Sequence, residues 1–115
     1  MDRRQHRLLK LMEECAEVAQ RASKQMLFGK HEVQQGQSLS NAERLRSEVL
    51  DVLLCIRICE REGHWQPITD DEIVAHEHRI GAKIHTAIDI AVSTGNVAKD
   101  AHRGIAGSSN DGEVK

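Results

Sequence analysis

Residues 40 to 63 read SNAERLRSEVLDVLLCIRICEREG, and this stretch decides the fold. At about 100° per residue, its apolar side chains surround most of a helix and leave only a narrow polar strip led by three arginines. Glu48 and Asp51 lie outside that strip, one turn apart on an apolar side. A helix that is apolar on all sides is usually buried, and a buried carboxylate must be paired, protonated or bound to a metal ion. We therefore expect positive charge beside these two acids.

The stretches on either side predict two more helices. Residues 3 to 28 carry a broad apolar arc and stop before Gly29, a residue that commonly ends helices. Ser-Asn-Ala-Glu at 40 to 43 is a capping box that opens the central helix. Thr-Asp-Asp-Glu at 69 to 72 is a second capping box, and the helix that it opens is expected to extend to about Thr94.

Composition favours an all-α protein. Aromatic residues are 2% of the 115-residue chain, and no stretch shows the alternation typical of strands. We expect one domain over residues 1 to 95, a bundle of three long helices per chain, followed by a disordered tail over 96 to 115. Because two neighbouring helices cannot cover every apolar side of the central helix, we expect a homodimer or homotetramer to complete the bundle.

Charge and cysteine usage exclude several classes of protein. The net charge is -2 with both signs interspersed, which gives no basic footprint for duplex nucleic acid. The charged first residues are followed by no apolar run of signal-peptide or membrane-spanning length, so we expect a cytoplasmic protein without a membrane partner. Of the three cysteines, Cys55 and Cys59 lie four residues apart on the central helix, but no further ligand follows at zinc-finger spacing, and they are interpreted as small, reduced core residues.

The first helix carries acids of its own. Glu13, Glu14 and Glu17 lie near its middle, as Glu48 and Asp51 do on the central helix, so antiparallel packing would bring the two sets to one level. Such a group of carboxylates needs divalent cations, and oxygen ligands suit Mg²⁺, with Mn²⁺ as a substitute. The alternative for the first helix is a solvated face with ion pairs between residues four apart, Lys10 with Glu14 and Glu17 with Arg21.

EECAE at residues 13 to 17, followed by EVLD at 48 to 51, resembles the EExxE and ExxD signature of the MazG-like all-α nucleoside triphosphate pyrophosphohydrolases. The similarity covers roughly residues 8 to 63 and extends loosely to Lys83. The resemblance implies an oligomeric helical bundle that binds Mg²⁺ through these acids. It also implies hydrolysis of a nucleoside triphosphate between the α and β phosphates, which gives the monophosphate and pyrophosphate. The connection between the two motifs is longer than in the family pattern, and no clear fourth helix follows.

The roles that fit this chemistry can be assigned residue by residue. The metal ligands would be Glu14, Glu17, Glu48 and Asp51. The catalytic residues would be Glu13, as the base that activates the attacking water, and Glu14. Positive charge on the leaving pyrophosphate would come from Lys83, Arg21 and Lys24. Trp65 could stack on the base, although a core or interface role is the alternative for such a residue.

Two other classes of protein also gather acids on helices. A di-iron carboxylate bundle needs Glu-x-x-His motifs, and none of the seven histidines lies three residues after a glutamate. A noncatalytic helical interaction module would pair its acids with arginines, and Arg44 or a partner chain could serve Glu48 and Asp51 in that way. Metal-dependent release of pyrophosphate distinguishes the enzyme from the module.

Overall fold

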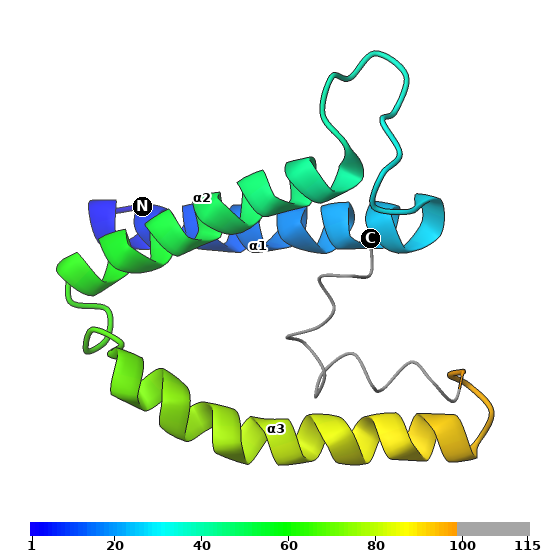
Figure 1. The fold of residues 1–115 in the computed structure, drawn as a ribbon. Coiled ribbons are helices and arrows are strands. Elements are labelled where there is room, and N and C mark those ends of the chain that lie inside the picture. Colours follow the sequence, from blue (N-terminus) through cyan, green and yellow to red (C-terminus); the bar gives the residue numbers. More distant parts are fainter. Residues whose placement is uncertain (99–115) are drawn as a thin grey trace. The chain divides into compact units, whose positions relative to one another are not determined.

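A computed structural model describes residues 1–98, which form three helices and no strand (Figure 1). The helices are α1 (Arg3–Phe28), α2 (Asn41–Arg61) and α3 (Asp70–Ser93). The prediction of an all-α chain with three long helices is confirmed. None of these helices is long and apolar enough to cross a membrane.

The chain divides into two compact units, Met1–Pro67 and Ile68–Lys115, and each is described by itself. The first unit holds α1 and α2, and the second holds α3. The disordered tail predicted for residues 96 to 115 falls almost entirely outside the described residues.

The helix boundaries follow the capping signals of the sequence. Ser40 and Thr69 cap α2 and α3 as predicted, and each forms a reciprocal capping box with the glutamate three residues later. A third box, between Asp2 and Gln5, opens α1 and was not predicted. Gly29 follows α1 with a φ of 90°, a backbone conformation that glycine adopts without strain.

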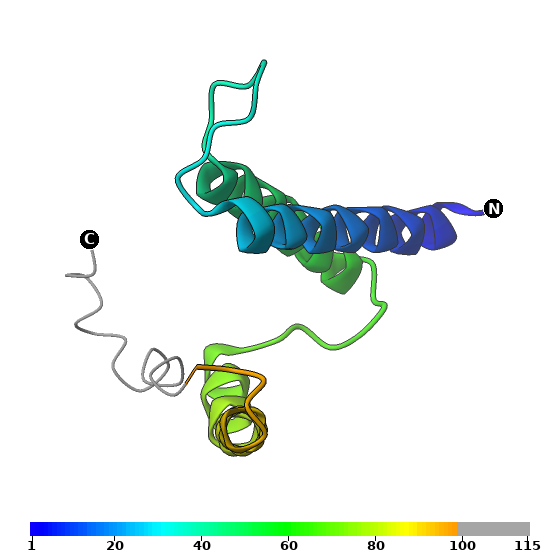
Figure 2. The ribbon, with the colours of Figure 1, turned by 90° about the vertical axis from the view of Figure 1, so that its right-hand side faces the viewer.

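Helices α1 and α2 pack against each other as an antiparallel pair (Figure 1, Figure 2). At one end, the side-chain amide of Asn41 donates to the Gly29 carbonyl oxygen at 2.8 Å. At the other end, Arg7 Nε donates to Glu62 Oε2 at 3.0 Å, and a ring nitrogen of His64 lies 3.1 Å from the Arg4 carbonyl oxygen. These contacts fix the register of the two helices at both ends.

The side of α1 that packs against α2 is mixed in character. Its half-buried residues repeat every three or four positions and include Arg7, Leu11, Glu14, Val18, Arg21 and Gln25. The stripe one residue further along is entirely apolar and is exposed: Leu8, Met12, Cys15, Ala19, Ala22 and Met26. A mixed stripe of α1 therefore faces its neighbour, while an apolar stripe remains uncovered within the first unit.

Helix α2 is covered on one side only. Its buried residues are Asn41, Cys59 and Glu60, whereas Leu53 and Leu54 are 50% and 56% exposed. Within the first unit, the expectation that this helix is buried all round is therefore not met, because a single neighbouring helix shields only one face. Cys59 is the one apolar side chain that is fully buried among residues 1–98.

Helix α3 is amphipathic in sequence and begins with three acids, Asp70 to Glu72, in its first turn. Isoleucines mark its apolar side, and of these Ile73 and Ile84 are exposed while Ile80 and Ile88 are half-buried. The second unit thus also presents uncovered apolar surface.

Candidate metal centre

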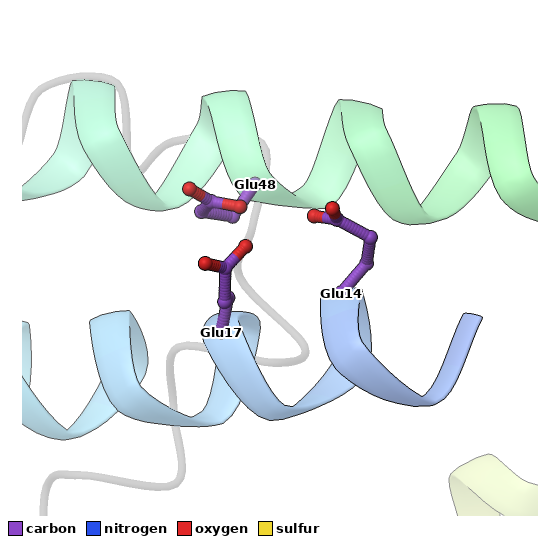
Figure 3. Close-up of side chains that lie close together, drawn as sticks. All are labelled: Glu14, Glu17 and Glu48. Atoms are coloured by element: carbon purple, nitrogen blue, oxygen red, sulfur yellow. The ribbon is translucent and has the colours of Figure 1, made fainter. Parts of the chain in front are cut away.

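Three acids meet where α1 and α2 face each other. Glu14 and Glu17 extend from α1 toward Glu48 on α2 (Figure 3), and one carboxylate oxygen from each lies within 4.8 Å of the other two. The structure therefore brings together three of the four residues predicted as metal ligands. We refer to Glu14, Glu17 and Glu48 as the acidic cluster.

Local geometry explains how the cluster forms. Glu14 and Glu17 are three residues apart and lie on neighbouring turns of one side of α1. Glu48 comes to the same level because the antiparallel register is fixed by Asn41 at one end of the pair and by Glu62 at the other. No backbone strain is involved, since both helices are continuous through these positions.

The cluster is electrostatically strained without a cation. Burial raises the pKa of Glu14 above its ordinary value, and the neighbouring Glu17 and Asp51 charges raise it further, whereas Lys10 lowers it. Burial also raises the pKa of Glu48, followed by the charges of Glu17, Asp51 and Glu14. Both shifts favour uptake of positive charge, either as protons or as a metal ion.

The hydrogen bonding of the cluster is incomplete. The Oε2 atoms of Glu14 and Glu48 are buried and have no hydrogen-bond partner. Within residues 1–98, no lysine or arginine nitrogen lies at ion-pair distance from Glu17, Glu48 or Asp51. Buried carboxylate oxygens without partners are costly, and hard divalent cations use such oxygens as ligands. The donor set therefore fits Mg²⁺ or Mn²⁺.

Asp51 and Glu13 lie beside the cluster and not in it. Asp51 is exposed on α2, one turn beyond Glu48, but its charge still raises the pKa of both Glu14 and Glu48. Glu13 is half exposed, and its Oε1 lies 3.3 Å from the ammonium of Lys10. Neither predicted role is tested by this placement.

Two of the predicted phosphate-binding residues follow the cluster along α1. Arg21 lies one turn after Glu17, and its Nη1 is buried without a hydrogen-bond partner. Lys24 lies one turn further, with its ammonium 5.8 Å from the centre of the Phe28 ring, at cation–π distance. An unpartnered guanidinium nitrogen near the acids is consistent with an anionic ligand that bridges the two.

The other two predicted substrate-binding residues belong to neither α1 nor α2. Trp65 follows α2, and its Nε1 donates to Glu60 Oε2 at 3.4 Å. Lys83 is exposed on α3 in the second unit, where it lines a shallow pocket with Ala82 and Thr86. The roles of Trp65 and Lys83 stay predictions.

All three cysteines are free thiols. Cys59 is buried and Cys55 is half-buried, as expected for core residues, whereas Cys15 is exposed. The reason is that Cys15 belongs to the apolar stripe of α1 that α2 does not cover.

Comparison with protein-family models, with curated proteins and with solved structures finds no match. The resemblance of the two acid motifs to the MazG-like enzymes therefore rests on the sequence motifs alone, and the site is interpreted here from its own chemistry.

Sequence reasoning missed one residue that shapes this region and described another in part. Lys10 forms the ion pair with Glu14 that its spacing indicated, and it also contacts Glu13. Asn41 is 1% exposed and holds the connection between α1 and α2 through the Gly29 carbonyl and Glu32. The capping box placed Asn41 at the start of α2, but nothing in the sequence indicated that its side chain turns inward.

Proposed function

We propose that the chain is a metal-dependent hydrolase that converts a nucleoside triphosphate into the nucleoside monophosphate and pyrophosphate. The observation that carries this proposal is the acidic cluster, whose buried oxygens lack partners and face one another across two helices. The motif resemblance supplies the reaction, and the row of cations after the cluster supports a phosphate-chain substrate. We place this reaction in the cytoplasm as part of the same proposal.

Each residue would have a distinct task. Glu14, Glu17 and Glu48 would hold Mg²⁺ or Mn²⁺, and Asp51, one turn beyond Glu48 on α2, would complete the set. The bound cation would supply charge neutralisation at the phosphate and activation of water. Glu13, half exposed beside the cluster, would accept a proton from the attacking water.

Cationic side chains of α1 would position the phosphate chain. The free Nη1 of Arg21 would donate to oxygens of the leaving pyrophosphate, and Lys24 would add a second positive charge one turn away. Helices hold these groups at fixed spacing, which favours a substrate of defined length.

We also propose that the protein is a homo-oligomer. The apolar stripe of α1 and the leucines of α2 leave large side chains uncovered in the first unit. Monomeric soluble proteins rarely expose large contiguous apolar patches, so we infer that a second copy of the chain packs against these side chains.

The products of the reaction test the proposed function. With excess Mg²⁺ and a panel of nucleoside triphosphates, chromatography should show a monophosphate and pyrophosphate. Glu48→Ala should abolish turnover while the helical circular dichroism stays unchanged. Glu77→Gln, a change at an exposed glutamate of α3, is the control and should leave turnover intact.

Formation of the diphosphate and orthophosphate would mean attack at the terminal phosphorus and would contradict the proposed reaction. If no nucleotide in the panel is cleaved with Mg²⁺, Mn²⁺ or Co²⁺, the noncatalytic interaction module becomes the better account of the chain.

A further inference from the structure

Lys10 is the cation in direct contact with the acidic cluster. Its ammonium lies 3.8 Å from Glu14 Oε1 and 3.3 Å from Glu13 Oε1. It sits one turn before Glu14 on the side of α1 that also carries Glu17. Lys10 has no role in the reaction proposed above.

The charges along this side of α1 follow a simple order. Reading from the N-terminal end, it carries Lys10, Glu14, Glu17, Arg21 and Lys24. At 1.5 Å per residue these positions span roughly 21 Å, with the acids in the middle and cations on both flanks. Cleavage between the α and β phosphates leaves the α phosphate on one side of the reacting bond and the β and γ phosphates on the other. Arg21 and Lys24 both follow the acids along α1, so they can bind phosphate oxygens on only one side of the reacting bond.

The contact between Lys10 and Glu14 is of a kind that a metal ion would replace. Glu14 uses Oε1 toward Lys10, while its Oε2 is buried and has no partner. A divalent cation held by Glu14 would neutralise the charge that Lys10 now balances. The lysine side chain is 46% exposed and flexible, so its ammonium can move to a nearby phosphate oxygen without disturbing the helix packing.

The position of Trp65, the residue predicted to stack on the base, fits a substrate whose nucleoside lies toward the N-terminal end of α1. It follows His64, whose ring lies 3.1 Å from the Arg4 carbonyl oxygen near the N-terminal end of α1. Arg21 and Lys24 lie beyond the cluster, toward the other end of α1. Trp65 on one hand and Arg21 and Lys24 on the other thus lie on opposite sides of the acids, and Lys10 lies on the same side as Trp65.

We propose that Lys10 binds the α phosphate, the one that carries the nucleoside, once Glu14 has taken up a metal ion. The substrate would then lie along α1 with its nucleoside toward the N-terminal end and its pyrophosphate toward Arg21 and Lys24. This inference rests on the proposed function and adds the direction of the substrate.

Binding of the two product fragments tests the proposal without turnover. The full chain is loaded with Mn²⁺ and titrated calorimetrically with inorganic pyrophosphate, and separately with each of the common deoxynucleoside 5′-monophosphates. A charge-assisted hydrogen bond contributes about 1.5–3 kcal/mol, so Lys10→Met should weaken monophosphate binding by about 10- to 100-fold. Pyrophosphate binding should change less than about twofold. Lys10→Arg should retain most of the monophosphate affinity.

Two further variants control the measurement. Lys30→Met removes an exposed lysine from the connection between α1 and α2 and should leave both affinities unchanged. Arg21→Met should show the opposite pattern to Lys10→Met, with a loss confined to pyrophosphate. Circular dichroism and Mn²⁺ affinity are measured on every variant. If Lys10→Met does not fold, Lys10→Gln replaces it in the binding measurements.

The outcomes separate the two proposals. Unchanged monophosphate binding in a folded Lys10→Met would overturn the role of Lys10 while leaving the proposed hydrolysis in place. Equal losses for both fragments would mean that Lys10 contributes only general attraction for anions, which also overturns the assigned direction. Failure of the Mn²⁺-loaded parent to bind any fragment would remove the proposed function, and the role of Lys10 with it.

Discussion

Asn41 shows how one side chain sets the geometry of the site. Its amide nitrogen donates to the Gly29 carbonyl oxygen at 2.8 Å and to Glu32 Oε1 at 3.0 Å, and the residue is 1% exposed. These bonds tie the end of α1 to the start of α2. The position of Glu48 opposite Glu17 depends on that connection.

Asn41→Ala should destabilise the first unit by about 1–3 kcal/mol, because the Gly29 carbonyl and Glu32 lose a buried donor. Denaturant unfolding followed by circular dichroism measures the loss. Gln37→Ala, at an exposed position of the same connection, is the control and should have little effect. A change of equal size in both variants would show that Asn41 has no special role.

The pH dependence of the metal-free protein follows from the cluster. The pKa values of Glu14 and Glu48 lie above 4.5, the ordinary value, when the chain is folded. The folded chain therefore binds more protons than the unfolded chain, and its stability falls as the pH rises through the raised pKa values. Glu43 acts in the opposite direction, because its bond with Ser40 lowers its pKa and that contribution is lost in acid.

The midpoint of thermal unfolding without metal should therefore decrease from mildly acidic toward neutral pH, and Mg²⁺ should reduce the decrease. In Glu48→Gln, the midpoint of thermal unfolding should change less between mildly acidic and neutral pH. This variant should be no less stable than the parent at neutral pH. A large loss of stability in metal-free Glu48→Gln would instead indicate that Glu48 takes part in a stabilising ion pair.

At the scale of the elements, the ends of the helices could be predicted and their facing sides could not. Ser40 and Thr69 were identified as caps, and Gly29 as a stop, because capping depends on nearby residues only. The side of α1 that packs on α2 depends on distant contacts such as Arg7 with Glu62. Sequence periodicity favoured the apolar stripe, but α2 packs on the neighbouring stripe, in which Leu11 and Val18 alternate with polar residues.

The same limit applies to the candidate site. Sequence reasoning grouped Glu13 and Glu14 as adjacent acids, and only packing against α2 separates them. The Glu14 side chain is 14% exposed and joins the cluster, whereas Glu13 is 54% exposed and pairs with Lys10. The convergence of Glu14, Glu17 and Glu48 could be predicted, because all three lie near the middle of antiparallel helices.

The capping boxes give a direct test at this scale. Ser40→Ala removes the side-chain acceptor for the Glu43 backbone N–H, a bond of 3.2 Å, and should cost about 1 kcal/mol of stability. Thr69→Ala makes the matching change at the start of α3. Because α2 belongs to the first unit and α3 to the second, hydrogen exchange should report faster opening of α2 in the first variant and of α3 in the second. Equal effects of both variants on α2 would contradict this assignment.

At the scale of the whole molecule, uncovered apolar surface is the main feature. The exposed stripe of α1 has small residues, Cys15, Ala19 and Ala22, at its centre, where another helix could approach closely. Leu53 and Leu54 of α2 add larger exposed side chains to the first unit. A second copy that covers this surface would bury apolar area that the described chain leaves in water.

Light scattering at micromolar concentration should therefore give the mass of a dimer or tetramer. Ala19→Glu, which puts a charge in the centre of the stripe, should shift the mass toward the monomer. Gln20→Glu changes an exposed residue of the same helix outside the stripe and should leave the mass unchanged. A monodisperse monomer for the parent would contradict the proposed oligomer and weaken the resemblance to the MazG-like enzymes.

Calorimetric titration with Mn²⁺ decides whether the acidic cluster holds a divalent cation. The parent should bind Mn²⁺, and Glu48→Gln should bind it much more weakly, because the cluster loses a carboxylate ligand. Glu77→Gln on α3 should bind as the parent does. Binding of Mn²⁺ by Glu48→Gln as tightly as by the parent would contradict the account.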